Sequence, residues 1–228
     1  MSDVSRSVEV IFKRIREAAA RAGRKPDEIV LVAATKGVPL EKIQEGAECG
    51  VTAFGENKVQ EAERKFFETS FLEGRRPPVS LHLIGPLQTN KVKKAVGRFD
   101  LIHSIDSLRL AEKVEEEAAR RFLTQPVLVQ VNIGGEPTKH GAPVAQAPSL
   151  VEAIRGLPHL ALQGLMTLPP PTPDPEGARP YFSALREMGR ALGLSRFSMG
   201  MSSDFEIAIE EGATWVRIGT AIFGARSL

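Results

Sequence analysis

Short apolar runs alternate with charged segments along the whole chain. The first run, 29–35, combines β-branched residues with alanine and is followed by Gly37 and Pro39, which predicts a strand buried on both faces. Seven comparable runs lie at 52–56, 80–85, 101–105, 126–133, 161–168, 196–201 and 214–219. The pattern therefore predicts eight short strands.

The charged segments between these runs have the spacing of amphipathic helices. In 107–123, the apolar positions that share one helical face are Leu108, Ala111, Val114, Ala118 and Phe122. A further helix precedes the first strand, where the apolar positions at helical spacing are Val4, Val8, Ile11, Phe12, Ile15 and Ala19. We expect this N-terminal helix to pack its apolar face on the domain.

Strands that alternate with helices indicate βαβ units and a parallel sheet. Eight such units in 228 residues predict an α/β fold, a single closed (β/α)8 TIM-like barrel domain over 1–228 with the extra N-terminal helix added. An open, doubly wound sheet is the alternative, because miscounting one strand would exchange the two predictions. We interpret the proline-rich segment 168–177 as a stiff loop, since the roughly fifty residues after it are too few for a second core.

Composition narrows the class of protein. Lysine and arginine number 30 against 28 acidic residues, and this net charge of +2 does not favour nucleic acid or an anionic membrane. The single cysteine, Cys49, cannot form an intramolecular disulfide, which fits a reducing, cytoplasmic compartment. The four histidines are dispersed, so we expect no metal site. Charged residues interrupt the N-terminal segment and every apolar run is short, so we expect neither a signal peptide nor a membrane span.

Functional residues of such barrels lie at the carboxyl ends of the strands. Lys36 ends the first predicted strand, where it either snorkels to water or takes part in chemistry. The loops after the last two strands, "GMSSD" and "IGTAIFG", contribute Ser202, Gly219 and Thr220, which suit a phosphate group held by backbone N–H donors. Each loop alone is more typical of a helix N-cap. Their joint position at the two expected strand ends favours a phosphate site.

A lysine across the barrel mouth from a phosphate site suits a ligand that carries both an aldehyde and a phosphate. Pyridoxal 5′-phosphate (PLP) and the sugar phosphate of a Schiff-base aldolase both meet this description. Arg217 lies two residues before Gly219 and therefore on the same face of its strand. Some PLP enzymes place an arginine at the pyridine nitrogen, whereas the alternative for Arg217 is pairing with a barrel carboxylate. Together with Lys36, this arginine favours PLP.

Several motifs carry a resemblance over nearly the whole chain. They are "ATKG", "FGENKVQEA", "HLIGPLQTNKVKKAV", "LIHSIDSLRLA", "QVNIGGEPTKHG", "GLMTLPP" and "FSMGMSSDFEIAIEEGATWVRIGTAIFGAR". In these motifs the chain resembles the pyridoxal phosphate homeostasis proteins of the YggS/PROSC type. Members of that family are single-domain barrels similar to the N-terminal domain of alanine racemase. The resemblance therefore implies the same barrel and a PLP cofactor for this chain.

The resemblance also implies roles for individual residues. Lys36 is expected to hold PLP as an internal aldimine, and Arg217 to face the pyridine nitrogen. The residues expected to bind the phosphate or line the pocket are Ser202, Gly219, Thr220, Met201 through its backbone, and Asn57. "TKHG", within the loop 134–141, departs from the serine-lysine version of the family, so Lys139 is given no role.

The same resemblance argues against efficient amino-acid turnover. An arginine does not protonate the pyridine nitrogen, so the ring is a poor electron sink. Racemisation also needs a second base, which alanine racemase takes from a C-terminal domain of its partner subunit. That domain is not expected here, and the chain's one tyrosine, Tyr181, follows the proline segment. We therefore expect a PLP carrier without catalytic residues; a PLP-dependent racemase or decarboxylase is the enzyme alternative.

Expected partners are PLP and PLP-dependent apoenzymes, with no nucleic acid, and we expect a monomer. Nucleic-acid binding is the third class considered, because "NKVKKAVGR" contains the basic residues Lys91, Lys93, Lys94 and Arg98. Such a short patch is more often a solvated helix face.

Overall fold

The structure is a computed structural model, and it describes residues 2–69, 71–74 and 78–224. The final two residues of the "FGAR" motif lie outside this range. The strands are β1 (Val30–Ala34), β2 (Ala53–Glu56), β3 (Ser80–Leu83), β4 (Leu101–Ile105), β5 (Gln125–Asn132), β6 (Ala142–Pro143), β7 (Leu160–Thr167), β8 (Phe197–Ser198) and β9 (Trp215–Ile218).

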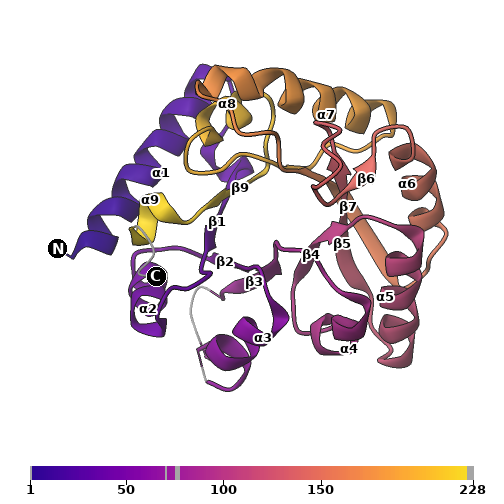
Figure 1. Ribbon diagram of the computed structural model, residues 1–228. Coiled ribbons are helices and arrows are strands. Elements are labelled where there is room, and N and C mark those ends of the chain that lie inside the picture. Colours follow the sequence, from indigo (N-terminus) through magenta and orange to yellow (C-terminus); the bar gives the residue numbers. More distant parts are fainter. Residues whose placement is uncertain (1, 70, 75–77, 225–228) are drawn as a thin grey trace.

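The strands form a closed barrel (Figure 1). All pairings are parallel, β1 lies between β2 and β9, and the pairing of β4 with β5 completes the ring. The two-residue β6 is an additional edge on β5 and lies outside the ring of eight. The predicted barrel is thus confirmed against the open sheet.

Two details of the strand prediction were wrong. β6 was missed because it is only two residues long and follows the loop 134–141. The seventh predicted strand, 196–201, is shortened to Phe197–Ser198. Gly200 has a φ of 89°, which ends the extended conformation and turns the chain towards α8.

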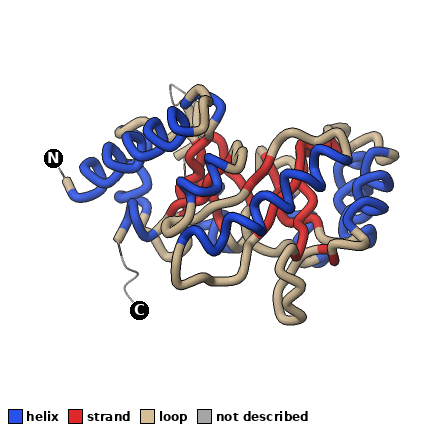
Figure 2. Tube along the Cα trace, turned by 90° about the horizontal axis from the view of Figure 1, so that it is seen from above, coloured by secondary structure: helices blue, strands red, loops and turns tan. Residues whose placement is uncertain are grey.

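Helices cover the outside of the barrel (Figure 2). They are α1 (Asp3–Arg21), α2 (Leu40–Glu48), α3 (Val59–Ala62), α4 (Val92–Ala95), α5 (Leu108–Arg120), α6 (Ala147–Arg155), α7 (Arg179–Ala191), α8 (Phe205–Glu210) and α9 (Thr220–Phe223). Short turns are η1 (Pro26–Glu28), η2 (Glu63–Phe67), η3 (Thr89–Lys91) and η4 (Pro175–Ala178). The predicted N-terminal helix is α1, which packs against α2, α8 and α9.

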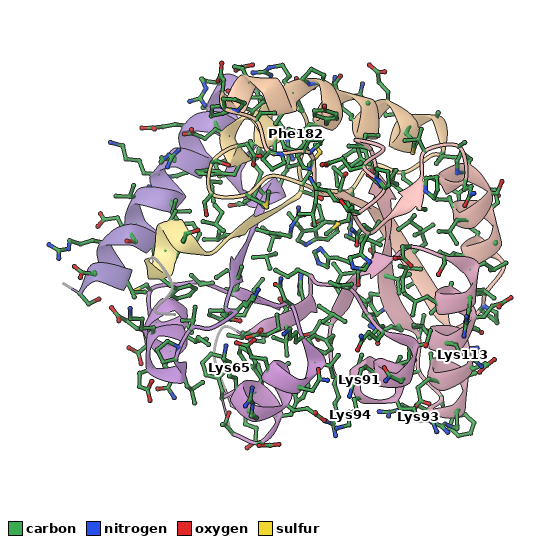
Figure 3. All side chains as sticks on the ribbon, viewed as in Figure 1. Lys65, Lys91, Lys93, Lys94, Lys113 and Phe182 are labelled. Atoms are coloured by element: carbon green, nitrogen blue, oxygen red, sulfur yellow. The ribbon has the colours of Figure 1, made fainter. Side chains whose placement is uncertain are left out.

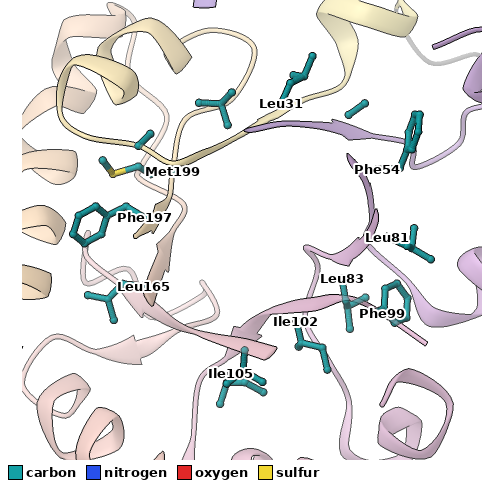
Figure 4. Close-up of a cluster of buried hydrophobic side chains, with 14 of the residues drawn as sticks. Leu31, Phe54, Leu81, Leu83, Phe99, Ile102, Ile105, Leu165, Phe197 and Met199 are labelled. Carbon is teal, nitrogen blue, oxygen red and sulfur yellow. The ribbon is translucent and has the colours of Figure 1, made fainter. Parts of the chain in front are cut away.

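Two apolar clusters hold the layers together. The larger one lies between strands and helices, where side chains such as Leu31, Phe54 and Leu165 point away from the barrel axis (Figure 4). The smaller one fills the barrel interior and includes Val32 and Trp215. Because side chains alternate between the two faces of a strand, β1, β2, β4, β5, β7 and β9 contribute to both clusters, whereas β3 and β8 place the polar His82 and Ser198 in the interior.

The apolar face predicted for 107–123 is partly wrong. Ala111, Val114 and Ala118 are buried, but Leu108 is 45% exposed, the helix ends at Arg120, and Phe122 is 95% exposed with a φ of 55°. The chain reverses there, because the N–H of Leu123 donates to the carbonyl of Ala118 in a C-terminal cap. This turn carries Phe122 away from the core.

Candidate functional site

Lys36 lies in the turn that follows β1. Side chains from α3 and η2 bind the backbone on both sides of it. The Lys65 ammonium donates to the carbonyl of Thr35 at 2.6 Å, and the N–H of Gly37 donates to Glu61 at 2.6 Å. Lys65 belongs to η2, a single π-helical turn that continues α3. These two contacts fix the direction in which the Lys36 side chain leaves the barrel wall.

The two neighbouring lysines differ in their partners. Besides Thr35, Lys65 binds Glu61 at 2.6 Å and the fully buried Glu56 at 2.9 Å. Burial raises the pKa of the Glu56 carboxyl, although Lys65 and the Thr35 hydroxyl oppose this shift. The amine of Lys36 has no hydrogen bond or ion pair within the described residues. Lys36 is therefore the lysine whose amine remains available to a ligand.

Arg217 projects into the barrel, as predicted from its strand face. Its guanidinium donates to the Ser198 hydroxyl at 2.5 Å and to the carbonyl of Thr167 at 2.8 Å. Burial lowers the pKa of Arg217 to about 10, and the nearby Asp204 partly offsets this. No carboxylate forms an ion pair with it in the part of the chain that the structure describes. Three of its five N–H donors are left for a ligand.

A hydrogen-bonded chain continues from Arg217 across the interior. The Ser198 hydroxyl contacts His103 Nδ1 at 2.8 Å, and His103 Nε2 contacts His82 Nδ1 at 3.0 Å. Burial lowers the pKa of His82 to about 4, and burial, with His82 and Arg217 nearby, also lowers that of His103. Both imidazoles are therefore neutral at pH 7, and Arg217 is the one positively charged member of this row of hydrogen-bonded side chains.

The loops after β8 and β9 meet beside the end of β1. The backbone N–H of Arg217 donates to the carbonyl of Gly200 at 3.0 Å, which joins the loop after β8 to strand β9. Asp204 shapes the first loop by accepting the Met201 N–H at 2.6 Å. A Cβ on Gly219 would lie 3.1 Å from the carbonyl oxygen of Ala34, so glycine permits this close approach to the end of β1.

Several backbone N–H groups at these loops have no acceptor among the described residues. Among them are those of Ser202, Ser203, Thr220 and Ala221. Unpaired N–H groups at the start of a helix are the usual donors to a bound phosphate. The loops thus offer donors of the predicted kind.

Asn57 lies on the other side of Lys36, in the loop that follows β2. A Cβ on Gly85 would approach the Asn57 carbonyl oxygen to 2.3 Å, so glycine allows the loops after β2 and β3 to touch. Both loops line a cavity of about 760 Å³ that includes Lys36 and Asn57. This cavity opens at the carboxyl ends of the strands.

The structure thus brings most of the predicted residues to one end of the barrel. Sequence reasoning missed Lys65, Glu61 and the chain formed by Ser198, His103 and His82. A signal was present, since His82 and His103 stand at the middle of two adjacent apolar strands. The described residues contain no cluster of three or more His, Cys, Asp or Glu suited to a metal ion, and no helix long and apolar enough to cross a membrane.

Comparison with known proteins identifies relatives. Residues 7–227 match the model of the family "Alanine racemase, N-terminal domain". The chain is 45% identical over 222 residues to the pyridoxal phosphate homeostasis protein of Aquifex aeolicus, covering 95% of each chain. It is 42% identical over 228 residues to the protein of that name from Pseudomonas aeruginosa, covering 99% of this chain and 97% of the relative.

A solved structure extends the comparison to three dimensions. PipY of Synechococcus elongatus, solved with PLP bound, superposes with a TM-score of 0.80 at 35% identity, covering 92% of this chain and all of that one. This chain and PipY therefore share the barrel and the helices around it.

Proposed function

The chain belongs to the alanine racemase N-terminal domain family, and from this membership and the geometry of the site we propose that it binds PLP as a Schiff base on Lys36. The observation that carries the proposal is that the amine of Lys36 has no hydrogen bond or ion pair among the described residues, although the residues around it do. Lys65 is occupied by three acceptors, whereas Lys36 is positioned by its backbone and left without a partner in the described chain.

The donor set around Lys36 fits PLP. The N–H groups of Ser202 and Thr220 are suited to the phosphate, with Met201, Gly219 and the Ser202 and Thr220 hydroxyls at the same loops. The remaining N–H donors of Arg217 suit the pyridine nitrogen, which is an acceptor when it is not protonated. Asn57 lines the cavity on the far side of Lys36. The phosphate, the pyridine nitrogen and, through Lys36, the aldehyde of PLP thus each meet a group of matching chemistry.

We propose a carrier in PLP homeostasis rather than an enzyme. Bound PLP supplies an electron sink, and Arg217, buried and charged, leaves the ring nitrogen without the proton that strengthens this sink. The Ser198–His103–His82 chain ends in neutral imidazoles and presents no carboxylate that could bring a proton to the ring. Tyr181 lies near the start of α7, one of the helices that cover the outside of the barrel. These features support holding a reactive aldehyde.

The wider setting follows from the same reasoning. A carrier of PLP limits the free aldehyde and delivers it to PLP-dependent apoenzymes. We propose that it does so as a monomer in the cytoplasm, over one domain spanning 1–228. The free thiol of Cys49, half-buried at the end of α2, suits a reducing compartment.

The experiment is borohydride reduction of the PLP-loaded protein followed by peptide mass mapping. Reduced PLP is expected on Lys36 and on no other lysine. Lys36→Ala is expected to lose the fixed cofactor and keep its far-UV spectrum, whereas Lys113→Ala, in the outer helix α5, keeps both. Fixation on Lys65 instead would contradict the assignment. Steady turnover of any amino acid that Lys36→Ala abolishes would contradict the carrier function.

A further inference from the structure

The cavity beside Lys36 is lined by positively charged side chains that have no role in the proposed binding of PLP. It measures about 760 Å³ and is formed by the loop after β2, by α3 and η2, and by the loop after β3. The ionisable or basic residues that line it are Lys36, Lys58, Glu61, Arg64, Lys91 and His140. Four of these carry permanent positive charge, and one is acidic.

Three of the cations form no ion pair among the described residues, although Arg64 lies close enough to Glu61 to lower the pKa of its carboxyl. The side chains of Lys58, Arg64 and Lys91 make no hydrogen bond or ion pair with any residue that the structure describes. Nearby cations behave differently, because Lys94 and Arg98 both pair with Glu63. In Figure 3, Lys91 lies nearer the barrel than Lys93 and Lys94, which lie on the outer side.

The one acid of the cavity is already engaged. Glu61 accepts from Lys65 and from the N–H of Gly37, both at 2.6 Å. Burial raises the pKa of the Glu61 carboxyl, but these hydrogen bonds outweigh burial and hold its pKa below the usual value. Its charge is therefore balanced by Lys65, with a smaller share from Arg64, and Lys58 and Lys91 are left without an acidic neighbour in this lining. Like charges around one concave surface repel each other and attract anions.

This cavity is separate from the proposed phosphate site. Its lining comes from the ends of β1, β2 and β3, with His140 from the loop after β5, whereas Ser202, Gly219 and Thr220 follow β8 and β9. Because β1 lies between β2 and β9 in the barrel, the two sites flank Lys36 on opposite sides. PLP has one phosphate, which leaves the cavity on the β2 side for a different anion.

We propose that this cavity binds a small organic polyanion, of the dicarboxylate or phosphate-ester class, next to the Schiff base on Lys36. Lys58, Arg64 and Lys91 supply the charge, and the amides of Asn57, Gln60 and Gln88 line the same space and supply neutral donors. The inference rests on the proposed function, because it places the anion beside the carrier's reactive carbon. Such a ligand would couple retention of PLP to the level of an anionic metabolite.

The test uses protein whose PLP has been fixed by borohydride, so that the phosphate loops are filled and cannot bind the probe. Pyrophosphate and succinate are titrated into this protein by calorimetry. We expect at least one of them to bind, and each of Lys58→Gln, Arg64→Gln and Lys91→Gln to weaken binding about tenfold. Lys93→Gln is the matched control, since the exposed side chain of Lys93 is also basic and forms no hydrogen bond or ion pair among the described residues, but lies outside the cavity; it is expected to change affinity less than about twofold.

Three results would overturn the proposal. They are no binding of either probe to the reduced protein, an equal loss of affinity in Lys93→Gln, and binding only to protein without PLP. Tighter, strongly salt-dependent binding of a short RNA through the same residues would show a nucleic-acid surface instead. None of these results bears on Lys36, because peptide mapping tests the Schiff base separately. If PLP is not fixed at all, the proposed function fails first.

Discussion

The two ends of the barrel carry cavities of the same size and different character. The cavity at the carboxyl end contains Lys36, and a second cavity of about 760 Å³ lies at the amino end, beside the starts of β1 and β9. Both are rich in lysine or arginine. Volume does not distinguish the two ends, but acidic residues do, because Asp27, Glu28 and Glu210 line the cavity at the amino end and Glu61 is the one acid in the lining at the carboxyl end.

Pairing distinguishes them. At the amino end, Arg24 donates to the carbonyls of Ile209 and Ala213, and Arg186 binds Glu211 at 2.8 Å. Arg196 likewise donates to the Gln163 side chain at 2.8 Å. At the carboxyl end, the cations that face the cavity have no such partners among the described residues. Most arginines at the amino end therefore hold loops together, whereas the side chains of Lys58, Arg64 and Lys91 at the carboxyl end form no hydrogen bond or ion pair among the described residues.

The largest effect is expected from removing a structural cation. Arg24→Met should lower the free energy of unfolding by about 3 kcal/mol, because two carbonyls and Glu28 lose a charged donor. PLP binding should be unchanged. Arg190→Met, in the same cavity but without a described partner, should change stability by less than about 0.5 kcal/mol. Equal losses of unfolding free energy for Arg24→Met and Arg190→Met in urea would show that paired and unpaired arginines contribute alike to stability.

The interior between the two cavities should make the protein sensitive to acid. Burial lowers the pKa of His82 to about 4, below the roughly 6.5 of an unfolded histidine, so the unfolded state binds more protons between these values. Stability is therefore full at neutral pH and falls with acidification, by about 2 kcal/mol from His82 at about pH 5.

His82→Gln isolates this contribution, since glutamine can still accept from His103 without taking up a proton. Urea unfolding at neutral and acidic pH should show a loss about 2 kcal/mol smaller in His82→Gln than in the unaltered protein. The same loss in both would show that His82 is not held neutral.

A smaller effect is expected at the phosphate loops. Ser202→Ala and Thr220→Ala should each weaken PLP binding about fivefold, because a hydroxyl donor is lost while backbone donors remain. Urea midpoints should not move. Ser195→Ala, in the cavity at the amino end, is the control and should alter neither quantity. Unfolding of either loop variant would show that these residues are helix caps first.

The smallest effect is expected at Phe122, at the end of α5 that returns to the amino end of the barrel. Its φ of 55° is unfavourable for a residue with a Cβ, and its side chain is 95% exposed, so little packing is lost on substitution. Phe122→Gly should stabilise the protein by about 0.5 kcal/mol after the entropy of glycine is counted. A decrease in the urea midpoint would indicate that the ring makes a contact that its exposure does not show.

The barrel was predictable because parallel strands buried on both faces appear as continuous apolar runs. Lys36 and Arg217 were also accessible to sequence reasoning, since one ends a strand and the other follows from the two-residue alternation of β9. The contact between His103 and Ser198 was not, because 95 residues separate them and only ring closure brings β4 and β8 to the same interior. Lys65 was hidden for a related reason, since its position depends on a π-helical turn that no periodicity indicates.

Trp215 has a practical consequence beyond packing. It is the one tryptophan of the chain, it is buried within the barrel, and its ring centroid lies 6.0 Å from that of His103. It also precedes Arg217 by two residues on the same strand face. Because PLP absorbs in the emission range of indole, a single tryptophan in the barrel that binds PLP would lose fluorescence by energy transfer. The intrinsic fluorescence of Trp215 should therefore report the fraction of protein molecules that hold PLP, without any added label.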